Sequence, residues 1–261
     1  MWRPHDRFSP VLLTKKLKPT LHRRAFSIFG TMHTMKRVAF FDIDGTVFRS
    51  SLLIELVHAL IEQGAFSPSV RDEYRRAHEA WQNREGAYDA YITDVIRAFR
   101  THIRGVHYGT FADVGRAVVK QQEKRVYRYT RDLIKDLKGK DYYIVAISQS
   151  PKTILDDFCA SYGFDKVYGR MYEIGPRDCF TGNVIDESVI ADKAIIIERL
   201  LEKGGFTLEG SVGVGDTEGD IPLLMKVETA ICFNPNRKLY ERAKANKWAV
   251  VVERKDMVYT L

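Results

Sequence analysis

Short apolar runs alternate with helical segments along most of this chain, and this alternation restricts the fold more than any other feature. The first run, residues 37–41, ends directly in acidic residues and a glycine, as expected for a buried strand whose carboxyl end opens into a loop. Further strands are predicted at residues 142–147, 166–168, 211–214, 230–233 and 249–252, helices at residues 151–162, 190–201, 221–225 and 237–245, and a hairpin around residues 178–183. Strands that alternate with helices indicate an α/β fold with a mostly parallel sheet and helices on both of its faces.

Residues 51–131 interrupt this alternation, because they contain no convincing strand. Their apolar residues recur at helical spacing, and glycines and a proline divide the segment into several helices. We therefore predict a Rossmann-like α/β core formed by residues 35–50 and 132–261. The inserted segment, residues 51–131, is predicted to form an all-helical cap over the ligand edge of the sheet.

The positive charge of the chain is concentrated at its amino-terminal end. The 261 residues carry a net charge of +7, and residues 1–34 hold seven basic residues and one acid, which leaves about +1 for the rest. So small an excess makes no case for nucleic acid or another acidic partner. The basic tail lacks an apolar segment long enough for a secretory signal, and we favour an unstructured leader or an upstream start codon over an organelle-targeting segment. Residues 1–34 are therefore left out of the predicted fold.

The cysteines and the apolar runs bear on the compartment. Three cysteines, Cys159, Cys179 and Cys232, are widely spaced and form no C-x-x-C pair, which argues against a disulfide framework or a zinc site. This usage favours a reducing compartment, and we predict a cytoplasmic location. No apolar run approaches the ~20 residues that span a bilayer, so no membrane partner is expected. Nothing in the sequence indicates an oligomeric state.

The strongest local signal is the segment Phe41-Asp42-Ile43-Asp44-Gly45-Thr46 at the end of the first predicted strand. Reactive groups in open α/β sheets gather beyond the carboxyl ends of the strands. Two carboxylates at such a position repel each other unless a cation offsets them, and Mg²⁺ meets that need with few protein carboxylates. A capped turn is the alternative interpretation, because Asp and Gly are common turn residues.

A second acidic segment, residues 215–220, follows the strand predicted at residues 211–214. If the two strand ends are neighbours, Asp42, Asp44 and Asp216 converge on one metal ion. Asp220 could hold a metal-bound water, orient a lysine, or act as the N-cap of the helix predicted from residue 221. These interpretations stay open.

A serine and a lysine complete the candidate set. Ser148 follows a predicted strand, so its hydroxyl would face the same crevice and could donate to a phosphoryl oxygen. Lys193 lies near the start of a helix, where a positive side chain is poorly placed for the helix dipole, and neutralising a phosphate would explain that position. Each residue alone is a weak signal, and their order along the chain with the acidic segments makes them informative.

The combined pattern resembles the haloacid dehalogenase superfamily of phosphatases over residues 36–252. The inserted helices and the stretch at residues 180–183 resemble its phosphoserine-phosphatase-like branch. The first motif is matched by Asp42 and Asp44, the second by Ser148, the third by Lys193, and the fourth by Asp216 with Asp220.

This resemblance implies a magnesium-dependent phosphatase that hydrolyses a small phosphorylated metabolite, a phosphate monoester, through an aspartyl-phosphate. Asp42 would be the nucleophile, and Asp44 the acid that protonates the leaving oxygen and then the base that activates water. Mg²⁺ would be held by the Asp42 carboxylate, the Asp44 backbone carbonyl and Asp216, while Ser148 and Lys193 would hold phosphoryl oxygens. Related ATPases usually carry Thr at the position of Asp44, so an acid there favours hydrolysis.

Two departures from the branch bear on the substrate. Ser51 stands where phosphoserine phosphatases carry a glutamate nine positions after the nucleophile, and Gln149-Ser150 replaces their Gly-Gly pair. Phosphoserine is therefore disfavoured as the substrate. The alternatives are a phosphotransferase, a nucleotide or nucleic-acid phosphatase, and a non-catalytic phosphate-sensing or interaction protein.

The predicted cap offers polar side chains that could contact a leaving group. Most of them are expected to form a solvated face instead. They are Arg75, Arg76, His78, Trp81, Arg84, Arg97 and Arg100.

Overall fold

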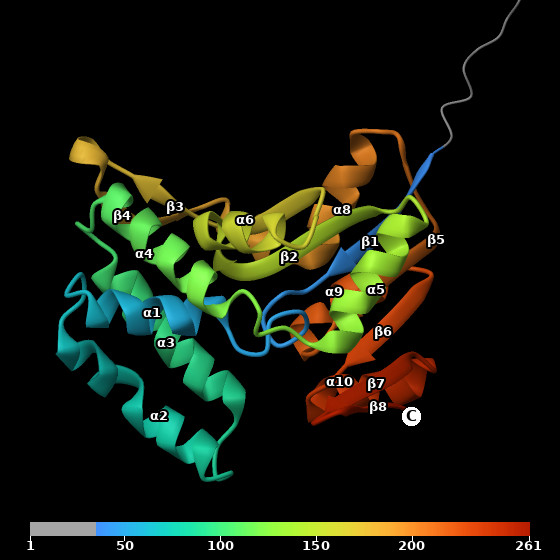
Figure 1. Cartoon of the computed structure of the whole chain (residues 1–261), viewed down its shortest axis with the longest axis horizontal. Coiled ribbons are helices and arrows are strands. Elements are labelled where there is room, and N and C mark those ends of the chain that lie inside the picture. Colours follow the sequence, from blue (N-terminus) through green and yellow to red (C-terminus); the bar gives the residue numbers. More distant parts are fainter. Residues whose placement is uncertain (1–34) are drawn as a thin grey trace, which may run out of the picture. The chain divides into compact units, whose positions relative to one another are not determined.

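The computed structural model describes residues 35–261, and the basic tail at residues 1–34 lies outside the described residues. The described residues form one eight-stranded sheet in the order β4-β3-β2-β1-β5-β6-β7-β8 (Figure 1). Six strands run parallel: β1 (Lys36–Phe41), β2 (Tyr143–Pro151), β3 (Lys166–Ile174), β5 (Phe206–Gly215), β6 (Thr229–Phe233) and β7 (Ala249–Arg254). The edge strands β4 (Phe180–Ile185) and β8 (Met257–Thr260) are antiparallel. The predicted α/β fold with a mostly parallel sheet is confirmed.

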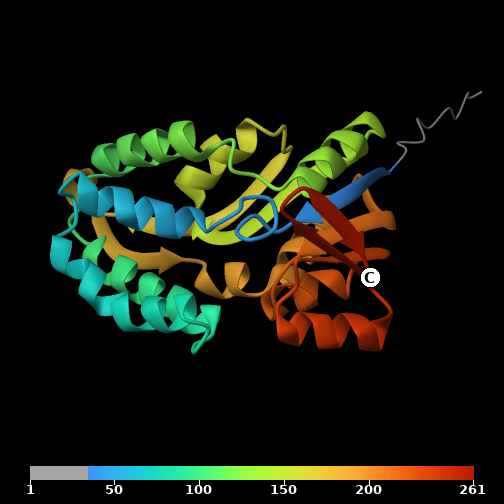
Figure 2. The same cartoon turned by 60° about the horizontal axis from the view of Figure 1, so that its bottom comes forward.

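Both faces of the sheet are buried, as the side chains of β1 illustrate. Ala39 and Phe41 pack into one apolar cluster, and Val38 and Phe40 pack into another on the opposite face. The first cluster includes residues of α5 (Arg128–Gly139) and α6 (Lys152–Ala160). The second includes residues of α7 (Glu187–Ala191), α8 (Lys193–Glu202), α9 (Ile221–Leu224) and α10 (Arg237–Asn246). Figure 2 shows helices on both sides of the sheet, as predicted.

The segment between β1 and α5 is helical. It contains α1 (Leu52–Glu62), a short 3-10 turn (Pro68–Arg71), α2 (Asp72–Gln82), α3 (Tyr88–His102) and α4 (Tyr108–Gln122). Helix α3 packs against α1 and α2, α1 packs against α4, and α4 packs against α6 (Figure 1). Helix α5 begins inside the range predicted for the cap, residues 51–131. However, the backbone N–H groups of Arg128 and Tyr129 donate to the Glu253 carboxylate of β7, at 3.1 and 2.8 Å. These bonds connect the first turn of α5 to the sheet.

Two predicted elements are wrong in detail. The helix expected at residues 190–201 is broken at Asp192, whose backbone is extended (φ −115°, ψ 105°) and whose carboxylate accepts the Ala194 N–H at 2.9 Å. A new helix, α8, therefore begins at Lys193, which places this residue at a helix start as predicted. The strand at residues 249–252 is not the last one, because the short edge strand β8 follows it.

The predicted hairpin around residues 178–183 is present as the β3–β4 pair. Its strands are longer than the sequence suggested, with β3 extending to Ile174 and β4 beginning at Phe180. Among the helices of residues 35–261, none combines the length and the apolar composition needed to cross a bilayer.

The sheet has its topological switch point at β1. The chain runs from β1 to β2 and β3 on one side and later to β5 and β6 on the other. Side chains that follow β1, β2 and β5 therefore meet at the carboxyl edge of three neighbouring strands, the usual place for a ligand site in this architecture.

Candidate active site

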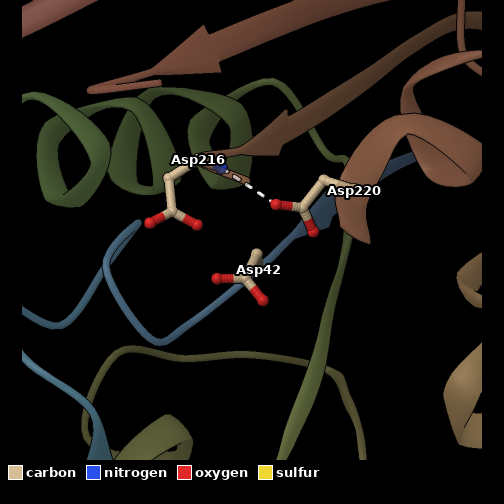
Figure 3. Close-up of side chains that lie close together, drawn as sticks. All are labelled: Asp42, Asp216 and Asp220. Carbon is tan, nitrogen blue, oxygen red and sulfur yellow. Dashed lines mark hydrogen bonds between the residues drawn. The ribbon is translucent and has the colours of Figure 1, made fainter. Parts of the chain in front are cut away.

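Three carboxylates meet beyond the ends of β1 and β5. Phe41 of β1 lies beside Val214 of β5, and the Asp42 N–H donates to the Val214 carbonyl oxygen at 2.9 Å, so the acids that follow the two strands are neighbours. One oxygen each of Asp42, Asp216 and Asp220 lie within 4.8 Å of one another (Figure 3). Of the three acids predicted to converge, Asp42 and Asp216 lie in this acid cluster, and Asp220 takes the third place instead of the Asp44 side chain.

Glycine at position 45 makes this close approach possible. Gly45 has a φ of +84°, in the left-handed region that other residues rarely adopt. A Cβ atom at this position would overlap Asp216 Oδ2. The loop after β1 can therefore lie against Asp216 only if residue 45 has no side chain.

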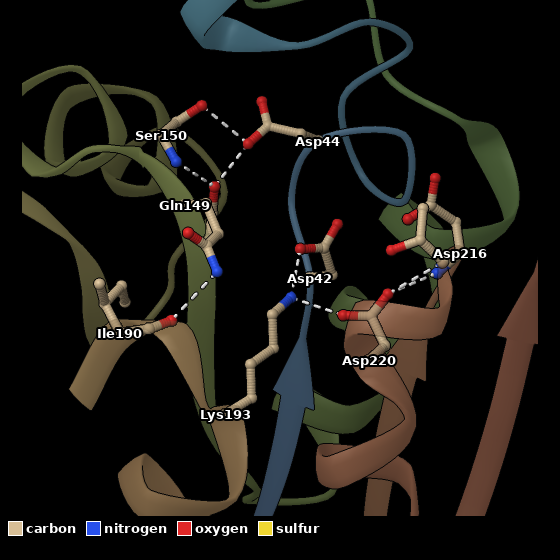
Figure 4. Close-up of polar contacts among 10 residues, drawn as sticks. Asp42, Asp44, Gln149, Ser150, Ile190, Lys193, Asp216 and Asp220 are labelled. Atoms are coloured by element: carbon tan, nitrogen blue, oxygen red, sulfur yellow. Dashed lines mark hydrogen bonds and ion pairs between the residues drawn. The ribbon is translucent and has the colours of Figure 1, made fainter. Parts of the chain in front are cut away.

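Lys193 connects two members of the cluster. Its Nζ donates to Asp42 Oδ1 and to Asp220 Oδ1, both at 2.5 Å, and its side chain is only 6% exposed (Figure 4). Burial disfavours the charged ammonium, but the charges of Asp220 and Asp42 outweigh this and hold the pKa of Lys193 above its ordinary value. The ammonium is therefore a fixed positive charge beside Asp42.

Asp220 has a second task. Its Oδ2 accepts the backbone N–H groups of Asp216 and Thr217, at 2.9 and 3.0 Å, and so holds the loop that carries Asp216. Its carboxylate forms no capping hydrogen bond to α9, so the helix-cap interpretation is not observed. Of the roles considered from the sequence, orientation of the lysine is the one that the contacts of Asp220 support.

Asp44 points away from the acid cluster toward β2 (Figure 4). Its Oδ2 accepts the hydroxyls of Ser148 and Ser150, the latter at 2.8 Å, and its Oδ1 accepts the Leu52 N–H at 2.6 Å. Asp44 thus caps α1, because Ser51, the residue before this helix, makes no side-chain capping bond. The hydroxyl of Ser148, predicted to bind phosphate, donates to Asp44 in this structure.

Ser150 is a site residue that we did not predict from the sequence. Its hydroxyl donates to Asp44, and its Oγ also accepts the Leu53 N–H at 3.2 Å. The signal was available, because alternate residues of a strand point to the same side and Ser150 lies two positions after Ser148.

Two of the clustered carboxylates are poorly satisfied by the protein itself. Asp42 Oδ2 is buried and has no hydrogen-bond partner among residues 35–261, and within the same part of the chain no hydrogen bond to a carboxylate oxygen of Asp216 is observed. Burial raises the pKa of Asp42 to about 7, although the charge of Lys193 opposes this shift. The pKa of Asp216 is also raised, mainly by burial and further by the negative charges of Asp42 and Asp220. Oxygen ligands that need a positive charge suit a hard divalent cation, and Mg²⁺ could be held by these groups.

A cavity of about 190 Å³ opens above the cluster. Its floor includes Asp42, Asp44, Lys193 and Asp216, and its walls include residues of α1 and α3. Tyr88 of α3 contributes to the wall. Burial, assisted by the charges of Asp44 and Asp216, raises the pKa of Tyr88, so its hydroxyl stays protonated.

Ser51 also lines this cavity, whereas the polar cap residues noted in the sequence do not. Arg97 pairs with Asp94 at 2.8 Å, and Arg100 pairs with Glu187 at 2.7 Å. His78 and Trp81 line a different cavity. The cap arginines are consistent with the solvated face that was expected of most of these residues.

Comparison with known proteins identifies relatives over most of the chain. The family model of haloacid dehalogenase-like hydrolases matches residues 39–225. A phosphoserine phosphatase of Archaeoglobus fulgidus is 23% identical over a match that covers 88% of this chain and 62% of that protein. A histidinol-phosphatase of Neisseria meningitidis is 22% identical over a match that covers 83% of this chain and 99% of that protein. A solved structure of a phospho-aspartyl intermediate analogue of phosphoserine phosphatase shares the fold, with a TM-score of 0.58 at 19% identity, over 85% of this chain and 96% of that one.

Proposed function

We propose, from the premise that this chain belongs to the haloacid dehalogenase-like hydrolase family, that it is a magnesium-dependent phosphatase acting on a small phosphate monoester. Relatives named as phosphoserine and histidinol phosphatases support phosphate-ester hydrolysis. The observation that carries the proposal is the state of Asp42. One of its oxygens is held by Lys193, and the other is buried beside Asp216 and Asp220 without a hydrogen-bond partner among residues 35–261.

Asp42 is proposed as the nucleophile. Lys193 pairs with the Asp42 carboxylate, and one oxygen of that carboxylate attacks phosphorus on the side opposite the leaving oxygen while the other would stay with the cation. A bond forms between Asp42 and phosphorus while the bond from phosphorus to the leaving oxygen breaks, giving an aspartyl-phosphate and an alcohol. The alcohol oxygen takes its proton from Asp44.

Asp44 is held in a way that suits this exchange. In the free protein its carboxylate accepts hydroxyls from Ser148 and Ser150. When the Ser148 hydroxyl turns to a phosphoryl oxygen, Asp44 Oδ2 is left free to reach the leaving oxygen, and the proton that it delivers is the one taken from water at the end of the preceding turnover. After the alcohol departs, Asp44 takes a proton from water, the water oxygen attacks phosphorus, and phosphate and free Asp42 result.

Mg²⁺ bound by Asp42, Asp216 and the Asp44 backbone carbonyl would offset the negative charge that carboxylates and phosphate bring together. Asp220 holds the loop of Asp216 and orients Lys193. Asp44 favours hydrolysis over stable phosphoryl storage, because a base is present to activate water. We also propose that the protein acts in the cytoplasm, and its three free cysteines support this.

Phosphate release from 4-nitrophenyl phosphate, with Mg²⁺ and after chelation, tests the proposal. The wild-type protein should release phosphate only with Mg²⁺, and Asp42→Asn should release none. Asp44→Asn should accumulate acid-stable label from a ³²P-labelled substrate, because the second step lacks its base. Asp141→Asn, a change at an exposed acid of the same protein, is the matched control. Full activity in Asp42→Asn would refute the assignment of the nucleophile.

A further inference from the structure

Helix α3 carries two apolar stripes, and only one of them belongs to the core. Tyr91, Val95 and Phe99 are buried in the main apolar cluster. Tyr88, Ile92 and Ile96, at positions i, i+4 and i+8, form a second stripe that is only partly buried and lines the cavity above the acid cluster. These residues pack in part against the main apolar cluster, and they also face the cavity.

The opposite wall is also apolar next to the reacting groups. Leu53 of α1 lines the cavity just beyond Ser150, whose hydroxyl accepts the Leu53 N–H. Both polar atoms of the neighbouring Gln149 amide are already hydrogen-bonded within the protein. Arg170 donates to its Oε1, and its Nε2 donates to the Ile190 carbonyl oxygen at 3.3 Å. A polar leaving group would therefore meet chiefly the hydroxyls of Ser51 and Tyr88, which carry no charge.

Positive charge is scarce in this cavity. Lys193 is the one basic side chain among the described lining residues, and its ammonium is held by Asp42 and Asp220. Asp89, next to Tyr88 on α3, adds a carboxylate to the lining. Lys238 stands 3.8 Å from Asp89, but it also pairs with Glu218 and does not line the cavity. Within this cavity, a carboxylate on the leaving group would thus be desolvated beside an acid, without a free cation among the described lining residues to pair with it.

We propose that the preferred substrates are phosphate monoesters whose leaving group is apolar next to the ester oxygen and carries no carboxylate or second phosphate there. The inference rests on the proposed function, and it names the class of alcohol that the phosphatase releases. Tyr88, Ile92, Ile96 and Leu53 are the residues that select this class.

The direct test compares propyl phosphate with 2-carboxyethyl phosphate, in which a carboxylate replaces the terminal methyl group. The kcat/KM of the wild-type protein, measured by phosphate release with Mg²⁺, should be at least about tenfold higher for propyl phosphate, because the carboxylate is buried without a partner. Along the series ethyl, propyl and butyl phosphate, kcat/KM should rise by up to about fourfold per methylene.

Matched variants locate the preference on the cavity stripe. Ile92→Arg places a cation in the cavity and should shrink or invert the preference for propyl phosphate. Thr93→Arg adds the same charge on the exposed face of the same helix and should leave the preference unchanged. Circular dichroism and the melting temperature report whether each variant is folded.

Binding of phosphonates gives a readout that needs neither a variant nor turnover. Calorimetry on the wild-type protein with Mg²⁺ should show tighter binding of propylphosphonate than of 2-carboxyethylphosphonate. Equal or tighter binding of 2-carboxyethylphosphonate overturns the inference. If 4-nitrophenyl phosphate is hydrolysed, a kcat/KM for 2-carboxyethyl phosphate that equals or exceeds that for propyl phosphate overturns it as well. Failure to hydrolyse any of these esters overturns the proposed function instead, and the phosphonate comparison then decides the preference of the cavity by itself.

Discussion

The floor and the helical wall of the cavity are built in different ways. On the floor, Asp42, Asp220 and Lys193 hold one another through hydrogen bonds and ion pairs, so a change to one leaves a buried charge on another. On the wall, Ile92 and Ile96 contribute apolar contact alone. The floor therefore tolerates little change and serves one chemistry, whereas the wall can be altered one residue at a time to change which alcohol fits.

The largest effect is expected from removing the buried ammonium of the floor. Lys193→Met keeps the apolar stem but leaves Asp42 and Asp220 without their shared cation. We expect kcat/KM for 4-nitrophenyl phosphate to fall by about 10²–10³, the loss typical of removing a preorganised charge that stabilises a transition state. Lys203→Met, at the exposed end of the same helix, should keep wild-type activity. Comparable activity in both variants would show that the floor is less interdependent than its contacts indicate.

A smaller loss is expected where the floor depends on the backbone. Gly45→Ala places a Cβ against Asp216 at a φ of +84°. The strain of a non-glycine residue in the left-handed region should cost about 1–2 kcal/mol of the free energy of unfolding, and the displaced Asp216 should weaken Mg²⁺ activation by about 10- to 100-fold.

Gly64→Ala separates these two consequences. Gly64 has a similar φ of +75°, but an added Cβ there would have no atom of the described part of the chain within 4 Å. The Gly64→Ala variant should lose stability, measured by chemical denaturation, without a change in the Mg²⁺ concentration that gives half-maximal activity. An equal shift in Mg²⁺ activation for both variants would mean that the contact between Gly45 and Asp216 does not shape the metal site.

Acidity should affect the floor in a way that Mg²⁺ reverses. Burial raises the pKa of Asp42 from 3.8 to about 7 and also raises that of Asp216, so the folded, metal-free protein binds more protons than the unfolded chain between these values. The stability that the Asp42 carboxyl contributes is then present at about pH 4 and lost as the pH rises through about 7, and Asp216 contributes in the same direction. With Mg²⁺ bound, the carboxylates are ionised and the cation should stabilise the protein most at high pH.

Melting temperatures in chelator and in Mg²⁺ across this range measure the effect. The difference between the two curves should grow as the pH rises from 5 to 8, and it should be much reduced in Asp42→Asn. A difference that is constant with pH would show that these carboxylates do not take up protons when the cation leaves.

The floor was easier to predict from the sequence than the wall. Asp42 and Asp216 each come at the end of an apolar run, and parallel strands bring such residues to one edge, so the sequence alone predicts that these two acids lie together. On the wall, Tyr88, Ile92 and Ile96 repeat with the same helical spacing as the buried Tyr91 and Val95. Only the packing of α3 against α1 and α2 shows which stripe faces the cavity.

Other misses have equally local causes. The break at Asp192 comes within an apolar segment whose periodicity continues through it, and the carboxylate of Asp192 stabilises the break by capping α8. Strand β8 is short and mostly exposed, so it lacks the buried run used to recognise a strand. Ser150 could be placed on the same side of β2 as Ser148 from strand alternation, but its hydrogen bond to Asp44 depends on the turn of Asp44 toward β2, which the sequence does not indicate.

The smallest effect is expected at the rim, where the wall meets the surface charges of the core. Asp89→Asn removes the carboxylate that a charged leaving group would meet, while its pairing with Lys238 is long and exposed and contributes little to stability. We expect kcat/KM for 2-carboxyethyl phosphate to rise by about two- to fivefold, because a charge contact near the surface contributes an energy of that order. The kcat/KM for propyl phosphate should stay within about twofold of wild type, because this ester carries no charge that Asp89 could repel at the cavity wall. Asp94→Asn, on the same helix but outside the cavity lining, should alter neither. Because the expected gain depends on charge alone, it should shrink as salt rises, and a gain that is insensitive to salt or equal for both esters would mean that Asp89 acts on the wall through its shape.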